Sequence, residues 1–496
     1  MLRSAQGTRG RHRVRRLMPP SSLALLLVIV AVVGLCWALL VPPWQSPDTV
    51  AHFAYTQSLA ESFRLPGDPH RMAVSRDQSA ADAAVGASRG AFYPEASPPS
   101  WSRAEYRAYL RLEHGNHPPS KSNGGGPNAA STNPPLYYLY AAAGYLIDAG
   151  GTGLGRLYSI QIWGVLLLLG TTIAAWLLAG ETFGRRRTAQ LACAAVAGLL
   201  PMTTFISTSV NPDAMMITVW TFALWLGARV INRGAQPGDC VALCAVNAAG
   251  ILVKATSYAL VVPVVLALAL GWLRRPRTER RRTAAVIGLA GLALVLPVIG
   301  WLTLAHALGR PGINQINSTA AATPFNARQF LSYLWQFYLP RLPFMTRFRV
   351  TPQLPVYDFW IRQATGDFGW LSVQLPHWVY RIAGVTLGVI SILAVALLTR
   401  LRDRRQLALL SFYALTLIAL LGLLHITDYR GIIAGQGTIM QGRYLLPAVG
   451  LLGLAVGLIV TRAPIRWRPG ACGLALTGLL LIQAISLVAV LEAFYL

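Results

Sequence analysis

Four places in the sequence carry ionisable side chains where they could act on a substrate. Asp48 and His52 are four residues apart, a spacing that puts both side chains on one face of a helix. A carboxylate so placed can accept the proton of a hydroxyl group as a general base. Asp is also a common helix N-cap, so a structural role for Asp48 stays open. The same two interpretations apply to Asp213, which follows Asn211-Pro212.

The other two places carry cations at the ends of apolar stretches. Lys254 is one of two lysines among 43 basic residues and lies in an apolar stretch, where an ionisable group is costly and indicates function. Arg443 and Tyr444 begin another such stretch. Two cations brought together would repel each other unless an anion lay between them. We therefore expect Lys254 and Arg443 to bind one anionic group, and an empty site to be strained.

The elements that must position these residues are membrane-spanning helices. The chain of 496 residues is 54% hydrophobic and only 12% charged, with a mean hydropathy of +0.48, whereas soluble proteins are about 25% charged. Apolar runs of about 18 or more residues predict helices that cross the bilayer. Eleven spans are expected, at 21–41, 156–181, 188–209, 212–230, 239–253, 256–273, 283–307, 378–399, 406–426, 443–461 and 470–493.

The arginine clusters indicate how these spans are oriented. The formal net charge of +25 would suggest nucleic acid in a soluble protein, but here the arginines gather in short gaps between apolar runs. Short arginine-rich loops stay cytoplasmic, so we expect no nucleic-acid partner, a cytoplasmic N-terminus and an extracytoplasmic C-terminus in a multi-pass cell-membrane protein. Of 18 acidic residues, this arrangement leaves four inside, namely Glu181, Asp239, Glu279 and Asp403.

The predicted organisation alternates membrane bundles with two long external loops. It comprises a cytoplasmic basic N-terminus at 1–20, a first transmembrane helix at 21–41, an external loop with juxtamembrane helices at 42–155, a transmembrane bundle at 156–308, a second external loop at 309–377 and a C-terminal transmembrane bundle at 378–496. The apolar stretch 134–148 is short, so we expect an interfacial or re-entrant helix whose Tyr137, Tyr138 and Tyr140 suit the lipid headgroup boundary.

Several motifs together resemble a known bacterial membrane family, domain of unknown function 2142 (DUF2142). They are Pro47-Asp48 with His52, Asn133-Pro134-Pro135-Leu136-Tyr137-Tyr138, Val210-Asn211-Pro212-Asp213, Lys254 and Gln441-Gly442-Arg443-Tyr444-Leu445-Leu446-Pro447. The resemblance spans nearly the whole chain, and the last motif is its most specific part. The family usually has Glu after the first Asp, where this chain has Thr49.

The family is similar in layout to the GT-C glycosyltransferases, and this resemblance implies a fold and an activity. The fold is all-α, with about eleven transmembrane helices and external juxtamembrane helices. The activity is transfer of a sugar from a polyprenyl-phosphate carrier to an envelope glycan or lipid acceptor. Asp48 would then be the general base, with basicity raised by partial desolvation. Lys254, Arg443 and Tyr444 would bind the donor, while His52 and Asp213 would orient the acceptor.

A different class of protein fits the same residues. A transporter, flippase or non-catalytic binder of lipid-linked glycans could hold an anionic headgroup with them. Transporters often show internal repeats and charged residues at mid-bilayer, whereas this chain has no evident repeat and collects its ionisable residues at one face. That favours an enzyme. No cofactor or metal site is predicted; one carboxylate with one histidine leaves a divalent ion open.

Overall fold

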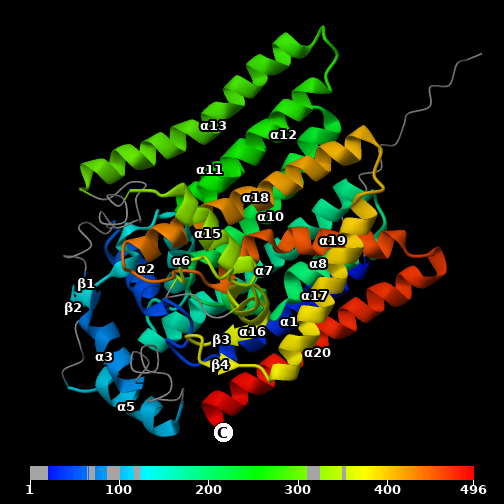
Figure 1. Ribbon diagram of the computed structural model, residues 1–496. Coiled ribbons are helices and arrows are strands. Elements are labelled where there is room, and N and C mark those ends of the chain that lie inside the picture. The colour runs from blue at the N-terminus through cyan, green and yellow to red at the C-terminus, as the bar shows by residue number, and fades with distance from the viewer. Residues whose placement is uncertain are drawn as a thin grey trace, which may run out of the picture.

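The computed structural model describes residues 21–63, 65, 73–85, 101–116, 123–309, 324–348 and 354–496. The expected basic N-terminus, 1–20, lies outside the described residues. Figure 1 shows a helical bundle with two small two-stranded sheets beside it. The predicted multi-span helical fold is therefore confirmed.

Nine helices in the described part of the chain are long and apolar enough to cross a membrane. They are α1 (Ser21–Leu40), α7 (Gly153–Phe183), α10 (Pro212–Arg233), η2 with α12 (Ala255–Leu273), α13 (Arg280–Ala307), α17 (His377–Leu398), α18 (Arg404–Ile433), η4 with α19 (Gly442–Arg462) and η5 with α20 (Ile465–Tyr495). Each corresponds to one of the eleven expected spans.

The two remaining expected spans differ from simple helices. The span expected at 188–209 is a pair, α8 (Arg187–Leu199) and α9 (Pro201–Ser207), bent by 58°. Pro201 begins α9 and has no backbone N–H to continue α8. The span expected at 239–253 is the 17-residue helix α11 (Pro237–Val253), which ends where Lys254 adopts an extended conformation.

The bundle has buried central helices and others whose apolar side chains stay exposed. Helices α7 and α10 pack against each other and are mostly buried. In contrast, α13 and α17 present exposed side chains such as Leu296 and Ile392. Figure 1 shows α13 along one edge of the bundle and α20 at the opposite edge. Lipid tails are themselves apolar, so such faces suit contact with the bilayer.

Helix α10 shows how the local sequence sets an element that carries a site residue. Asn211 is its N-cap, with the side-chain Oδ1 accepting a hydrogen bond from the Asp213 backbone N–H at 2.9 Å. Pro212 follows in the first turn, where its missing N–H costs nothing. Gly234 ends the helix with φ of 76°, a left-handed conformation that suits glycine. These signals place Asp213 in the first turn of a buried helix.

Two groups of shorter elements lie at one end of the bundle. The first contains α2 (Thr49–Ser62), β1 (Ala73–Ser75), α3 (Arg76–Val85), α5 (Arg103–Glu113), β2 (Asn123–Pro127), η1 (Ala129–Thr132) and α6 (Leu136–Ile147). The second contains α15 (Ala327–Tyr338), the π-helix η3 (Val356–Gln363), α16 (Ala364–Gly366), β3 (Asp367–Phe368) and β4 (Val373–Gln374). Both strand pairs are antiparallel: β1 with β2, which α3 and α5 separate in sequence, and β3 with β4, which form a short hairpin.

Helix α6 corrects the expectation for its tyrosines. Tyr137 and Tyr138 are buried, and the Tyr138 ring stacks on Tyr55 with centroids 3.7 Å apart. Only Tyr140 is partly exposed, and its hydroxyl donates to the Trp163 carbonyl oxygen at 2.7 Å. The placement of Tyr137 and Tyr138 at lipid headgroups was wrong, because α6 lies between α2 and α7 and these two rings fill the space.

Candidate active site

The loop between α1 and α2 carries Asp48, which does not cap its helix. Its backbone is left-handed, with φ of 61°, and its side chain makes no capping hydrogen bond. The carboxylate instead accepts a hydrogen bond from Arg443 Nη2 at 2.5 Å, across 395 residues of sequence. The capping interpretation of Asp48 is therefore wrong, and the residue is free for an electrostatic role.

Asp213 lies between both predicted cations. Its Oδ1 accepts a hydrogen bond from Lys254 Nζ at 2.5 Å, and its Oδ2 lies 3.7 Å from Arg443 Nε. Negative and positive side chains thus alternate along one series of contacts, which runs from Asp48 through Arg443 and Asp213 to Lys254. We call these four residues the ion-pair chain. Asn211 ties this chain to the Asp48 loop, since its Nδ2 donates to the Pro47 carbonyl oxygen at 3.1 Å.

The ion-pair chain corrects the expectation that Lys254 and Arg443 repel each other in an empty site. Two carboxylates and two cations balance within the protein, and Asp213 occupies the position expected for a bound anion. The sequence argument was wrong because it treated Asp213 as a separate group on α10. No external anion is needed to hold the two cations together.

Arg443 still has unused hydrogen-bonding capacity. Its side chain is 6% exposed, and its Nε and Nη1 atoms donate no hydrogen bond to any described residue. A buried donor without an acceptor costs free energy, so these atoms would gain from an added acceptor. The Tyr444 ring lies against both cations, with its centroid 5.0 Å from Lys254 Nζ and 5.4 Å from Arg443 Cζ.

Asp48 is the exposed member of the ion-pair chain. Its side chain is 46% exposed, whereas that of Asp213 is 1% exposed. Burial of the carboxyl raises its pKa, but the Arg443 guanidinium and other nearby positive charge more than offset this, so the pKa of Asp48 lies below its usual range. The expectation that desolvation raises the basicity of Asp48 was wrong. The carboxylate is ionised at neutral pH and open on one side.

His52 is a neutral neighbour of this chain. Its Nδ1 lies 2.9 Å from the Tyr138 hydroxyl, which also accepts a hydrogen bond from Asn133 Nδ2 at 2.8 Å. This contact joins the His52 ring to Tyr138 through Nδ1. Burial lowers the pKa of His52 to about 4, although Asp48 raises it. His52 is thus an uncharged ring at neutral pH that is held by Tyr138 through one of its two nitrogens.

All six predicted site residues lie at this end of the bundle, together with three residues that had been given no role. Asn133 and Tyr138 orient His52, and Gln363 accepts a hydrogen bond from the Gly442 N–H at 2.9 Å. The first two stood in a motif that carried the family resemblance, which was the available signal. Gln363 had none. Within the described ranges, no group of three His, Cys, Asp or Glu residues could hold a metal ion.

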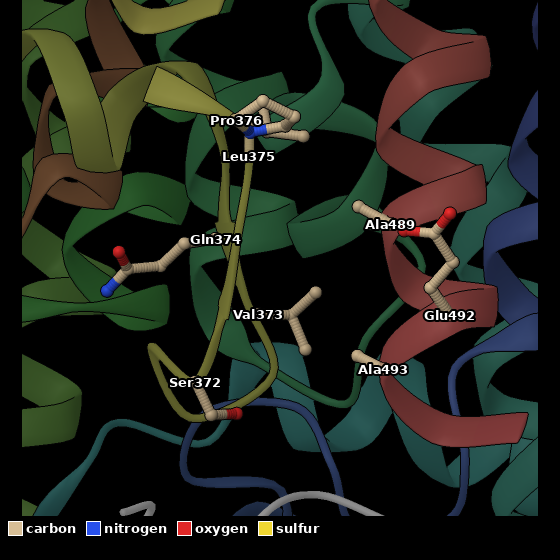
Figure 2. A pocket seen from close by; sticks show the side chains of 8 residues that line it. All are labelled: Ser372, Val373, Gln374, Leu375, Pro376, Ala489, Glu492 and Ala493. Carbon is tan, nitrogen blue, oxygen red and sulfur yellow. The ribbon is translucent and has the colours of Figure 1, made fainter. Parts of the chain in front are cut away.

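A shallow cavity of about 460 Å³ lies elsewhere, between the β3–β4 hairpin and the end of α20. Figure 2 shows Glu492 and Ala489 on α20 facing Val373 and Leu375 of the hairpin. None of the six predicted site residues lines it. The chemistry therefore has to be sought in the ion-pair chain.

Comparison with known proteins places the chain in a family. The sequence profile described as "Predicted membrane protein (DUF2142)" matches residues 31–452. A search of curated proteins finds no match.

Among solved structures, ArnT from Cupriavidus metallidurans bound to undecaprenyl phosphate has a TM-score of 0.47 and 14% identity, covering 93% of this chain and 63% of that one. The archaeal oligosaccharyltransferase AglB from Archaeoglobus fulgidus, in complex with an inhibitory peptide and a dolichol-phosphate, has a TM-score of 0.46 and 11% identity, covering 95% of this chain and 56% of that one. The chain therefore spans less than two thirds of either protein, and the likeness concerns the fold alone.

Proposed function

The chain belongs to the DUF2142 family of predicted membrane proteins, and from this premise and the geometry of the ion-pair chain we propose that it is a glycosyltransferase. It moves a sugar from a polyprenyl-phosphate carrier to an envelope glycan or lipid acceptor at the extracytoplasmic face. The observation that carries the proposal is an ionised, half-exposed Asp48 bound to a buried Arg443 that retains unused donors. A base and an anion-binding group are thereby adjacent.

Asp48 is the proposed general base. The acceptor hydroxyl oxygen attacks the anomeric carbon of the donor sugar, and its proton passes to the Asp48 carboxylate. The bond between that carbon and the carrier phosphate oxygen breaks, and its electron pair stays on the phosphate. Only the half-exposed carboxylate of the chain is accessible to an acceptor.

Arg443 and Lys254 are the proposed partners of the leaving phosphate. Negative charge grows on the phosphate as the bond breaks, and fixed cations stabilise it most in a site that excludes water. Arg443 Nε and Nη1 have no hydrogen-bond acceptor among the described residues, and phosphate oxygens are the acceptors that we assign to them. Tyr444 lies against both cations and limits where they can move.

Asp213 and His52 have different proposed roles. The sequence suggested that Asp213 orients the acceptor. Because Asp213 is buried between Lys254 and Arg443, we assign it instead to holding these two cations in place. His52 is neutral, and we assign it to orienting a sugar or acceptor oxygen through its second ring nitrogen, Nε2.

The proposed sidedness puts this site outside the cell. The opposite ends of the helices are joined by arginines, with Arg405 Nε donating to Asn232 Oδ1 at 2.6 Å and Arg233 pairing with Glu181 at 3.3 Å. Such arginine-rich ends stay cytoplasmic. The C-terminus lies on the site side, since the Tyr495 hydroxyl donates to the Leu40 carbonyl oxygen at 3.0 Å.

The proposal is tested by comparing lipid-linked sugars and surface glycans in a deletion strain. Complementation with wild type should restore one glycan modification and remove one accumulated lipid-linked sugar, as seen by mass spectrometry. Asp48→Asn should leave protein abundance unchanged but reduce transfer about 10²-fold or more, the usual scale for a lost general base. Asp239→Asn, which alters a carboxylate paired with Arg229 at the end of the bundle opposite the site, is the matched control and should complement fully. Full complementation by Asp48→Asn would overturn the proposal.

A further inference from the structure

We infer that Asp428 is a positioning residue. It fixes the position of the Arg443 side chain and thereby affects how strongly Arg443 binds an anion. The inference rests on the proposed function for what Arg443 binds. Asp428 is fully buried near the end of α18, one short loop before the segment Gly442–Ala448 that carries Arg443. No described cation lies within ion-pair distance of it. A buried carboxylate of this kind must be stabilised by hydrogen bonds.

One oxygen of Asp428 organises the loop that leads to Arg443. Its Oδ1 accepts hydrogen bonds from the Thr438 hydroxyl at 2.8 Å, the Ile439 N–H at 2.8 Å and the Met440 N–H at 3.2 Å. Hydrogen bonds to an ionised acceptor are roughly twice as strong as neutral ones. Three successive residues are thus fixed on one atom, three to five positions before Arg443.

The other oxygen of Asp428 joins the loop to the second group of short elements. Its Oδ2 accepts from the Tyr333 hydroxyl at 2.6 Å, so the Tyr333 oxygen in turn accepts from His425 Nδ1–H at 3.0 Å. His425 Nε2 then accepts from the Tyr338 hydroxyl at 2.8 Å. Each hydrogen bond in this series is donated in the direction of Asp428. The series therefore fixes the position of α15, which carries the two tyrosines, against α18, which carries His425 and Asp428.

The segment is also clamped from the other side. The Gly442 N–H donates to Gln363 Oε1 at 2.9 Å, and a Cβ at Gly442 would lie 2.4 Å from the Ala364 backbone nitrogen and 2.5 Å from the Phe359 carbonyl oxygen. Asp428 and η3 therefore hold the backbone just before Arg443 from two directions. A site group must lie within about 0.5 Å of its working position, so this clamp matters for binding.

The first test measures binding of undecaprenyl phosphate to purified full-length protein. Asp428→Asn keeps the size but replaces a charged acceptor by a neutral one, and should weaken binding about tenfold. Thr438→Val removes one donor from the loop and should act in the same direction without disturbing the core. The double variant Asp428→Asn/Arg443→Gln should bind no more weakly than Arg443→Gln alone, because both changes act through one guanidinium.

A matched control lies next to Asp428. Tyr429→Phe removes a hydroxyl that donates to the Asn326 carbonyl oxygen, a contact between α18 and the start of α15 that does not involve the 438–440 loop. This variant should bind the probe as wild type does. Equal weakening by Tyr429→Phe and Asp428→Asn would overturn the inference, since general tethering of α15 would then account for both.

A second test needs no ligand and separates the inference from the proposed function. The coupling between Asp48→Asn and Arg443→Gln in thermal stability reports their ion pair. We expect this coupling in the wild-type background and its loss in Asp428→Asn. Coupling that survives in Asp428→Asn would overturn the positioning role. The coupling could instead be lost in Asp428→Asn while Arg443→Gln leaves the binding of undecaprenyl phosphate unchanged. That result would overturn only the assignment of Arg443 to the phosphate.

Discussion

At Asp48 the backbone adopts a conformation that few side chains other than Asn and Asp tolerate. With φ of 61° the residue is left-handed, whereas a capping residue is normally extended and turns its side chain to the helix N–H groups. The side chain here turns to Arg443 instead. The first turn of α2 thus has no side-chain cap, and the Asp48 carboxylate instead becomes the exposed member of the ion-pair chain.

The ionisation of the site predicts how its activity depends on pH. The pKa of Asp48 lies below its usual range, and that of His52 is lowered to about 4 by burial. A base must be deprotonated to act, so activity falls only at acid pH, and kcat/KM should be flat from pH 6 to 8. Steady-state rates across this range on wild type and His52→Asn check this, since Asn can still accept from Tyr138. An inflection between pH 6 and 7 that disappears in His52→Asn would contradict it.

The lowered pKa of His52 also makes the free energy of unfolding depend on pH, with lower stability at acid pH. His52 in the unfolded chain takes up a proton near pH 6.5, but in the folded protein only near pH 4. Its contribution to stability is therefore complete above pH 6.5 and is lost as the pH falls toward 4.

Individual residues differ in how far the sequence could predict them. Lys254 and Arg443 stood out because a cation in an apolar stretch is rare. Asp428 did not, because an acid near the end of a span is unremarkable and its partners are mostly backbone N–H groups, which no side-chain pattern records. The pairing of Asp48 with Arg443 was equally hidden, since it joins segments that only the packed bundle brings together.

At the scale of elements, apolar runs predicted the spans well but not their breaks. Nine expected spans are continuous helices because their length and hydropathy suffice. The bend between α8 and α9 follows Pro201, yet Pro297 lies inside α13 without ending it. Proline alone therefore does not decide where a membrane helix breaks.

The contact between η3 and η4 gives a prediction at this scale. A Cβ at Gly442 would meet three backbone atoms at 2.4 to 2.6 Å, and backbone cannot move aside cheaply. Gly442→Ala should destabilise the protein by about 1–3 kcal/mol, the usual cost of overpacking. Thermal unfolding in detergent measures this loss. Gly422→Ala, at a position in α18 with nothing within 4 Å, is the control and should lose no stability.

An equal melting temperature for Gly442→Ala and Gly422→Ala would show that η3 and η4 do not pack as described. A smaller decrease in the melting temperature of Gly442→Ala, with normal protein abundance, would agree with a contact between η3 and η4 that relaxes partly around the added methyl group. Gly422 lies inside the α-helix α18, where alanine is favoured over glycine by about 1 kcal/mol, whereas Gly442 begins the 3-10 helix η4, so a loss of stability at Gly442 alone reports packing.

At the scale of the whole molecule, charge is sorted between the two ends of the bundle. Three of the four acids expected inside are paired with arginines at the end opposite the site: Glu181 with Arg233, Asp239 with Arg229 and Glu279 with Arg275. The fourth, Asp403, caps α18 by accepting from the Arg405 N–H.

This sorting predicts which loops face outward. In a background without cysteine, Ala104→Cys on α5 and Thr278→Cys between α12 and α13 place exposed thiols at opposite ends. An impermeant thiol reagent should label Ala104→Cys in intact cells whose outer envelope is permeable, and Thr278→Cys only after lysis. The reverse order would place the ion-pair chain in the cytoplasm and end the proposed use of an extracytoplasmic donor.

The 395 residues between Asp48 and Arg443 also set an order of events during synthesis. At about 5–20 residues per second, roughly 20–80 s pass between the appearance of these two residues at the ribosome. The pair of Asp213 with Lys254 can form early, because α10 and α11 are neighbours in sequence. Asp48 must wait for η4, which carries Arg443. A chain interrupted before that segment therefore contains Asp48, Asp213 and Lys254 but lacks the arginine that joins the two carboxylates, so the ion-pair chain is completed only late in synthesis.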